Sequence, residues 1–162
     1  RNVQRSASAA VSISAAGRWT GTRFMNPERV FFDTNILFYA HDIDAGVKHA
    51  RAKSLVLSAW EGEVDPCISV QVLQELLVNL IRNGLDDATA VSTVMDYLVW
   101  RTVDNSVQVF FDAVDLMQSH QLPFWDASII AAALNAGAAE LWTEDLNPGQ
   151  MYGKIKAVNP LQ

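Results

Sequence analysis

From residue 29 onward, short apolar runs alternate with longer stretches in which apolar residues recur at helical spacing. The short runs predict strands at 29–32, 64–69, 102–103, 140–143 and 155–158. The helical spacing predicts helices over 49–60, 72–81, 107–120 and from 125 or 126 to 136, plus a helix that Asp87 can cap. Strands that alternate with helices indicate a mostly parallel sheet covered on both faces. We therefore expect an α/β fold.

Residues 1–24 differ from the rest of the chain, because they are rich in Ala, Ser and Arg and show no apolar period. Met25 then begins a segment that leads directly into the first predicted strand. We expect residues 1–24 to be a disordered head, left from cloning or from upstream read-through, and residues 25–162 to form one domain. A transit peptide is the alternative, since Arg and Ser without acidic residues is its usual composition.

Half of the 162 residues are apolar, which is enough for a core without disulfides. The single cysteine, Cys67, lies in an apolar stretch, so we expect it to be buried in a reducing, cytoplasmic setting. No apolar run approaches the roughly 20 residues that span a bilayer, so we expect no membrane contact.

The net charge of −6 is unevenly spread. The head holds four arginines and no acid, while the remaining eight basic and 18 acidic residues give the body a net charge of −10. This argues against a general nucleic-acid coat protein, which would be basic. An acidic chain can still cut nucleic acid where metal ions neutralise its site, and it can also bind a basic protein partner.

Four acidic residues fall where such a fold would place a site. Asp33 directly follows the first strand and Asp145 follows a late one, and ligands of open α/β sheets collect at the carboxyl ends of strands. Asp126 lies at the start of its helix. Glu75 lies beside the apolar stripe of its helix, where a carboxylate is costly unless it is paired or bound to metal.

Carboxylates gathered at one edge would repel each other unless a cation shared them. Oxygen ligands of this kind suit Mg²⁺ or Mn²⁺, which polarise a phosphoryl oxygen and deliver a bound water as nucleophile. The pattern thus predicts metal-dependent hydrolysis of a phosphodiester. The three histidines are too scattered for a zinc site, and neither a glycine-rich phosphate loop nor a nucleophile elbow occurs.

Each acid also has an ordinary structural explanation when it is taken alone. Asp33 can cap the helix that begins near Asn35, because Asp-Thr-Asn is good turn chemistry. Asp126 can be a helix N-cap, Glu75 a solvated helix residue and Asp145 a loop residue. Only their joint placement favours a site.

Four segments together resemble the PIN domain family. They are Phe-Phe-Asp-Thr-Asn-Ile-Leu at 31–37, Val-Leu-Gln-Glu-Leu at 72–76, Phe-Trp-Asp-Ala at 124–127 and Leu-Trp-Thr-Glu-Asp-Leu at 141–146. The resemblance covers residues 29–160 and is strongest to VapC-type toxins of bacterial toxin–antitoxin pairs. It implies a three-layer α/β/α sandwich with a mostly parallel central sheet. It also implies an Mg²⁺- or Mn²⁺-dependent endoribonuclease that is usually a homodimer and is held inactive by a small antitoxin.

By the same resemblance, the catalytic and metal-binding acids are Asp33, Glu75, Asp126 and Asp145. Asn35 and Thr143 match the supporting polar positions, Asn35 orienting Asp33 and the Thr143 hydroxyl lying near Asp145. We leave Glu144 outside the metal site, because neighbouring residues of a strand point to opposite faces.

Two other functions compete with this one. A haloacid-dehalogenase-like phosphatase also has an Asp after a strand, but it needs a second Asp two residues on, where Asn35 stands. A non-catalytic PIN-like binding module is the other alternative, which a missing acid would suggest, and none is missing. The sequence leaves open which RNA is cut, how many metals bind and which antitoxin pairs with the chain.

The basic residues and the aliphatic helices each allow two interpretations. Lys48, Arg51 and Lys53 could meet RNA phosphates, or they could form a solvated helix face. The aliphatic helices at 70–83 and from 88 onward could form a dimer or antitoxin surface, although core packing is the more common reason for such residues.

Overall fold

The computed structural model describes residues 26–162, and the predicted disordered head at 1–24 lies outside the described residues. Within the described chain, the strands form one six-stranded sheet in the order β3-β2-β1-β4-β6-β5. Neighbouring strands pair in parallel except β5, which pairs antiparallel with β6. The strand bounds are β1 Arg29–Phe32, β2 Asp65–Ser69, β3 Arg101–Val103, β4 Glu140–Trp142, β5 Met151–Tyr152 and β6 Ile155–Val158.

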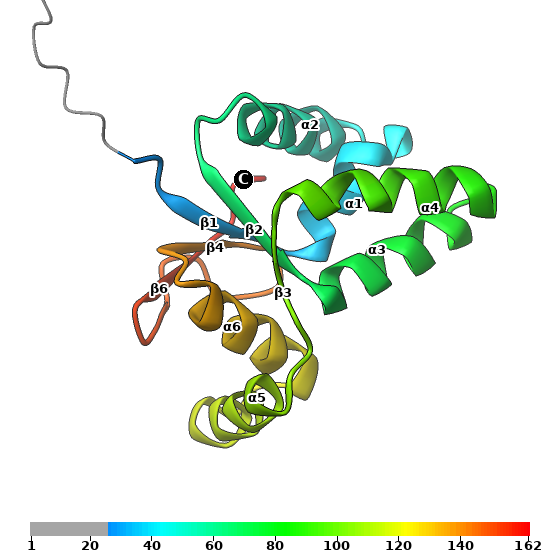
Figure 1. Ribbon diagram of the computed structural model, residues 1–162. Helices are drawn as coiled ribbons and strands as arrows, with labels where there is room; N and C mark the ends of the chain where they lie inside the picture. The colour runs from blue at the N-terminus through cyan, green and yellow to red at the C-terminus, as the bar shows by residue number, and fades with distance from the viewer. Residues whose placement is uncertain (1–25) are drawn as a thin grey trace, which may run out of the picture.

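Helices cover both faces of the sheet, α1 to α4 on one side and α5 and α6 on the other (Figure 1). The expected three-layer α/β/α sandwich is therefore confirmed. No helix within residues 26–162 has the length and apolar character needed to cross a membrane. The helix bounds are α1 Thr34–His41, α2 Val47–Trp60, α3 Val70–Arg82, α4 Asp87–Asp96, α5 Val107–His120 and α6 Phe124–Ala136, with short 3₁₀ segments η1 Ile43–Ala45 and η2 Tyr97–Val99.

Three local details differ from the sequence-based predictions. Helix α6 begins at Phe124 after Pro123, so Asp126 is its third residue and does not cap it. Helix α4 is capped by Asp86, whose side chain accepts a hydrogen bond from the Thr89 amide, and Asp87 is its first residue. The two-residue strand β5 was not predicted, because a strand this short carries no apolar period.

The core lies between the sheet and the two helix layers. Phe31 of β1 is fully buried and stands in register with Cys67 of β2 and Leu141 of β4. The predicted burial of Cys67 is thus confirmed, and burial raises the pKa of its thiol to about 12. Phe32 packs against Trp100 and Trp142, with ring centroids 5.0 and 4.9 Å apart. These aromatic contacts hold the carboxyl end of β1 firmly in the middle of the sheet.

The position of β1 explains why distant residues meet. Because β1 lies between β2 and β4, the segment after β1 is flanked by helix α3, which follows β2, and by the loop after β4. The Asp33 amide donates to the carbonyl of Trp142 at 3.0 Å, which ties the two strand ends together. Ser69 ends β2 and caps α3, its hydroxyl accepting from the Val72 amide at 3.3 Å.

Candidate active site

All four predicted acids line one small cavity at the carboxyl ends of the central strands. Its volume is about 100 Å³. Asp33 comes from the end of β1, Glu75 from α3, Asp126 from the first turn of α6 and Asp145 from the loop after β4. Asp33 and Asp145, more than 110 positions apart in the sequence, thus line the same cavity. This is expected at the edge of a sheet where parallel strands end.

Asp33 is the most buried of the four acids, with 8% of its surface exposed. Its Oδ1 accepts from the Thr34 amide at 2.7 Å, so it caps α1, and its Oδ2 accepts from the Thr143 hydroxyl at 2.6 Å. Burial raises the pKa of this carboxyl to about 7, with smaller contributions from the charges of Asp145 and Glu75, although the two hydrogen bonds act to lower it. Asp33 therefore both caps α1 and lines the acidic cavity.

Asn35 joins Asp33 to Asp145. Its side-chain nitrogen lies 3.2 Å from Asp33 Oδ2, 3.0 Å from Asp145 Oδ2 and 3.3 Å from the Thr143 hydroxyl. The Asp145 amide donates to that same hydroxyl at 3.1 Å. Asn35 thus contacts Asp33, and the Thr143 hydroxyl lies beside Asp145, as the resemblance to the family implied. Among the described residues, the buried Oδ1 of Asn35 has no hydrogen-bond partner.

Glu75 is held from two sides. The Thr34 hydroxyl donates to one of its carboxylate oxygens at 2.7 Å, and the Gln71 amide donates to the other at 2.9 Å. Thr34 and Gln71 are both buried. These contacts exclude the interpretation of Glu75 as an ordinary solvated helix residue.

Thr34 and Gln71 were not identified from the sequence. Gln71 carried a weak signal, since it is a polar residue inside the buried stripe of α3 and lies one turn before Glu75. Thr34 lies between two site residues, but its side chain turns to Glu75 across the gap between α1 and α3.

Asp126 differs from the other acids because no hydrogen bond to its side chain occurs among residues 26–162. Its pKa is raised, first by burial and then by the charges of Asp145 and Glu75. The same two neighbours also raise the pKa of Asp33. The cavity therefore gathers acidic side chains, and within residues 26–162 no Lys, Arg or His lines it to balance their charge.

The donor set of this cavity fits a hard divalent cation, because Mg²⁺ or Mn²⁺ would relieve the repulsion that Asp145 and Glu75 exert on the charges of Asp33 and Asp126. As the side chains stand, no three His, Cys, Asp or Glu residues within the described range form a group that could hold an ion. Binding would therefore draw these side chains inward, or water would remain between the ion and some of them, as is usual for Mg²⁺.

Glu144 is engaged outside the acidic cavity, although β4 ends at Trp142 and strand alternation is therefore not the reason. Its carboxylate accepts from the Tyr39 hydroxyl at 2.5 Å and from Lys48 at 2.6 Å. Lys48 also lies over the Tyr39 ring, 4.7 Å from its centroid. These contacts fasten the loop that carries Thr143 and Asp145 to α1 and α2.

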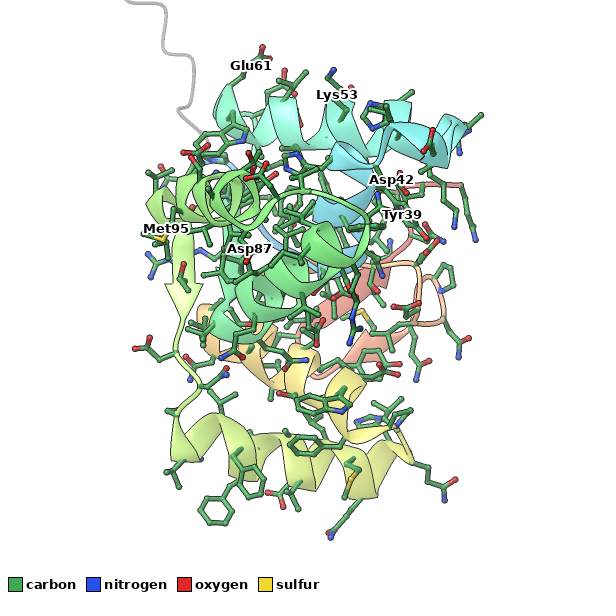
Figure 2. All side chains as sticks on the ribbon, turned by 90° about the vertical axis from the view of Figure 1, so that its right-hand side faces the viewer. Tyr39, Asp42, Lys53, Glu61, Asp87 and Met95 are labelled. Atoms are coloured by element: carbon green, nitrogen blue, oxygen red, sulfur yellow. The ribbon has the colours of Figure 1, made fainter. Side chains whose placement is uncertain are left out.

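The three basic residues considered for RNA phosphates are placed differently from one another. Lys48 is paired with Glu144, and the Arg51 guanidinium donates to the carbonyl of Leu161. Lys53 is exposed and points outward from α2 (Figure 2). Two of the three cations are thus engaged within the protein.

A larger cavity, of about 500 Å³, lies at the opposite edge of the sheet, where β1, β2 and β3 begin. Arg29 and Asp65 line it, but they pair with each other at 2.7 Å. Because ligands of parallel sheets bind at the carboxyl ends of strands, the smaller acidic cavity remains the candidate active site.

Comparison with known families identifies the fold. The model of the PIN domain family matches residues 30–154. The chain belongs to the PIN domain family. This excludes the haloacid-dehalogenase-like alternative. A comparison with curated proteins finds no match for this PIN domain.

Solved structures of toxin–antitoxin proteins resemble this PIN domain. A toxin–antitoxin complex from Klebsiella pneumoniae is 26% identical, with a TM-score of 0.60, covering 81% of this chain and 97% of that one. VapC20 of Mycobacterium tuberculosis, a toxin that cleaves the sarcin-ricin loop, is 22% identical with a TM-score of 0.57, covering 72% and 91%. VapBC2 of Rickettsia felis, bound to a DNA fragment from its promoter, is 19% identical with a TM-score of 0.56, covering 80% and 96%.

Proposed function

We propose that this PIN domain is a metal-dependent endoribonuclease and the toxin of a toxin–antitoxin pair, acting on RNA in the cytoplasm. The observation that carries the proposal is the convergence of Asp33, Glu75, Asp126 and Asp145 on one cavity. Family membership and the likeness to VapC toxins support the reaction and the biological role.

The proposed cofactor is Mg²⁺ or Mn²⁺, held by the four acids. When bound, such an ion polarises a phosphoryl oxygen and activates a water for attack. The contacts of Asn35 and Thr143 fix the carboxylates of Asp33 and Asp145 relative to each other. Thr34 and Gln71 do the same for Glu75.

Asp126 is suited to take a proton from the attacking water. Its side chain is free of hydrogen bonds to the rest of the described chain, and its pKa is raised from the usual value for Asp. A carboxylate whose pKa is closer to neutral accepts a proton more readily. The other three acids are each held by neighbouring donors, so they bind the ion in fixed positions, while Asp126 contacts it through one carboxylate oxygen and keeps the other for the proton.

The test is RNA cleavage by the purified protein with and without Mg²⁺ or Mn²⁺. We expect cleavage with either ion, none with a chelator, and a loss of about 100-fold or more in kcat for Asp126→Asn. Asp87→Asn is the matched control, because Asp87 is an exposed acid at the start of α4 (Figure 2). RNA binding without metal-dependent cleavage would favour the non-catalytic binding module instead.

A small antitoxin is the proposed protein partner, and a homodimer the proposed assembly. Similar folds come from toxin–antitoxin complexes, and the acidic body suits a basic partner. Helices α3 and α4 with η2 expose large apolar side chains that suit protein contacts. These are Val78, Ile81, Val91, Met95, Leu98 and Val99. Light scattering on a sizing column tests the dimer, and loss of RNA cleavage on adding the co-encoded upstream protein tests the antitoxin.

A further inference from the structure

Trp125 stands at the mouth of the acidic cavity with 64% of its surface exposed. It also lines a second cavity at this same edge of the sheet, of about 240 Å³, distinct from the cavity of about 500 Å³ at the opposite edge. Gln71, which holds Glu75, is the other residue shared by both cavities. The second cavity therefore adjoins the acidic one, and Gln71 and Trp125 line both.

The second cavity opens onto a row of aromatic side chains where α5 and α6 pack together. Consecutive ring centroids lie 5.4 Å apart from Trp125 to Phe124, 5.8 Å from Phe124 to Phe110 and 5.7 Å from Phe110 to Phe111. Phe110 and Phe111 are 52% and 57% exposed. Exposed aromatic side chains that also line a cavity, as Trp125 and Phe110 do, commonly mark an interaction site.

The lining of the second cavity is uncharged, unlike that of the acidic one. Phe110, Phe124 and Trp125 provide flat apolar faces, and Asn105, Ser106 and Gln71 provide amide and hydroxyl groups. An unpaired nucleobase needs both: a face on which to stack and polar groups for its edges. The cavity is smaller than the roughly 300–1,000 Å³ of sites for drug-sized ligands, so it suits a single ring system.

A third cavity at this edge, of about 350 Å³, shares Glu75 with the acidic cavity. Its lining includes Arg82 at the end of α3. Gln71, Glu75 and Arg82 are four and seven residues apart, so they follow one face of α3. An aromatic pocket, an acidic centre and a cation in sequence suit an extended strand of nucleotides better than a second copy of this chain.

We propose that the cavity beneath Trp125 and Phe110 binds an unpaired base next to the phosphodiester that is cut. The inference rests on the proposed nuclease function, because it assigns the phosphate to the acidic cavity. Base–aromatic stacking tolerates every base, so this pocket sets the preference for single-stranded RNA, and its amide and hydroxyl groups adjust the choice of base.

The test uses fluorescein-labelled oligo(A) and oligo(U) RNA with protein carrying Asp33→Asn, so that the strand stays intact in Mg²⁺. Adding Trp125→Ala or Phe110→Ala should weaken binding by about 5- to 100-fold, the range of one base–aromatic stack. Trp125→Phe should keep most of the affinity. Phe111→Ala is the matched control, because Phe111 belongs to the same exposed row but does not line the cavity; it should change binding by less than about twofold.

An abasic nucleotide placed at successive positions of the strand identifies the bound base. At the position whose base enters the pocket, removing the base should weaken RNA binding to protein with native Trp125. The same RNA should bind the Trp125→Ala protein no more weakly than intact RNA does. Such coupling is specific to direct contact between the two groups, since independent losses would add. With native Asp33, the same RNA position should lie beside the cleavage site.

The outcomes separate this inference from the proposed function. Cleavage with native Asp33, combined with Trp125→Ala and Phe110→Ala binding as tightly as Phe111→Ala, would refute the base pocket alone. Base-dependent binding through Trp125 without any cleavage would refute the nuclease function and leave the base pocket standing.

Conversion of a dimer to a monomer by these aromatic substitutions, Phe111→Ala included, would show that the aromatic row is a contact between two copies of the chain and would overturn the inference. No RNA binding at all would overturn both.

Discussion

Replacing Asp33 by Asn should stabilise the metal-free protein at alkaline pH. The folded protein holds the Asp33 carboxyl at a pKa of about 7, mainly because of burial, whereas an unfolded chain holds it near 3.9. The folded state therefore binds this proton more tightly. The contribution of Asp33 to the free energy of unfolding is greatest below about pH 4 and decreases as the pH rises toward 7. Above about pH 7 it no longer changes with pH. Asn has no charge to bury, so it escapes this loss.

The size of the effect follows from the shift. A change of about three pKa units corresponds to about 4 kcal/mol at 1.36 kcal/mol per unit. The Asn variant keeps only part of this stabilisation, because its single carbonyl oxygen cannot accept hydrogen bonds from both Thr34 and Thr143. A lost hydrogen bond costs about 1 kcal/mol. That cost is the same at every pH. The advantage of Asn should thus grow by about 2–3 kcal/mol between pH 5 and pH 8.

Thermal unfolding followed by circular dichroism, with a chelator present, measures this difference. For a domain of this size the Tm of Asp33→Asn should gain about 5 °C or more on the native protein between pH 5 and pH 8. Asp87→Asn is the control, and its Tm difference from the native protein should stay constant. An Asp33→Asn difference that is also constant would refute the reasoning. Adding Mg²⁺ should raise the Tm of the native protein and of Asp87→Asn but not of Asp33→Asn, because metal binding stabilises the folded state.

Three further predictions follow from other contacts. Gln71→Ala frees one oxygen of Glu75 and should weaken Mn²⁺ binding by about 10- to 100-fold in calorimetric titration; unchanged affinity would show that Gln71 does not position Glu75. Glu144→Gln should lower the pKa of Tyr39, which the hydrogen bond to Glu144 raises; ultraviolet titration measures this, and an unmoved curve would contradict the contact. Cys67 should resist thiol reagents at pH 8 until the protein unfolds, since its thiol is buried and stays protonated; rapid labelling of folded protein would show otherwise.

The fold was predictable where burial imposes a period on the sequence. Helix α3 and strands β1 and β2 carry such patterns because each packs against the core. Details set by local geometry were not predictable in the same way. Asp86 and Asp87 are chemically equal candidates for one cap, and only backbone geometry chooses Asp86. Pro123 precedes α6 where a polar cap was expected, so the start of that helix was placed too late.

The candidate site shows the same division. Asp33 and Asp145 were predictable from their places after strands, because the topology of a parallel sheet brings such positions to one edge. Thr34 and Gln71 were missed because neither residue type indicates chemistry by itself. Their importance lies in reaching Glu75, and that proximity exists only once α1 and α3 pack together.

The central place of β1 also sets the moment at which the candidate site can assemble during synthesis. Asp33 and Glu75 emerge early, but β4 must insert beside β1 before the loop with Asp145 reaches them. A nascent or prematurely ended chain lacking residues 140–145 leaves one side of β1 unpaired and Asn35 without its Asp145 contact. The candidate site can therefore assemble only after β4 and the loop with Asp145 have left the ribosome, and the proposed cutting activity would arise no earlier.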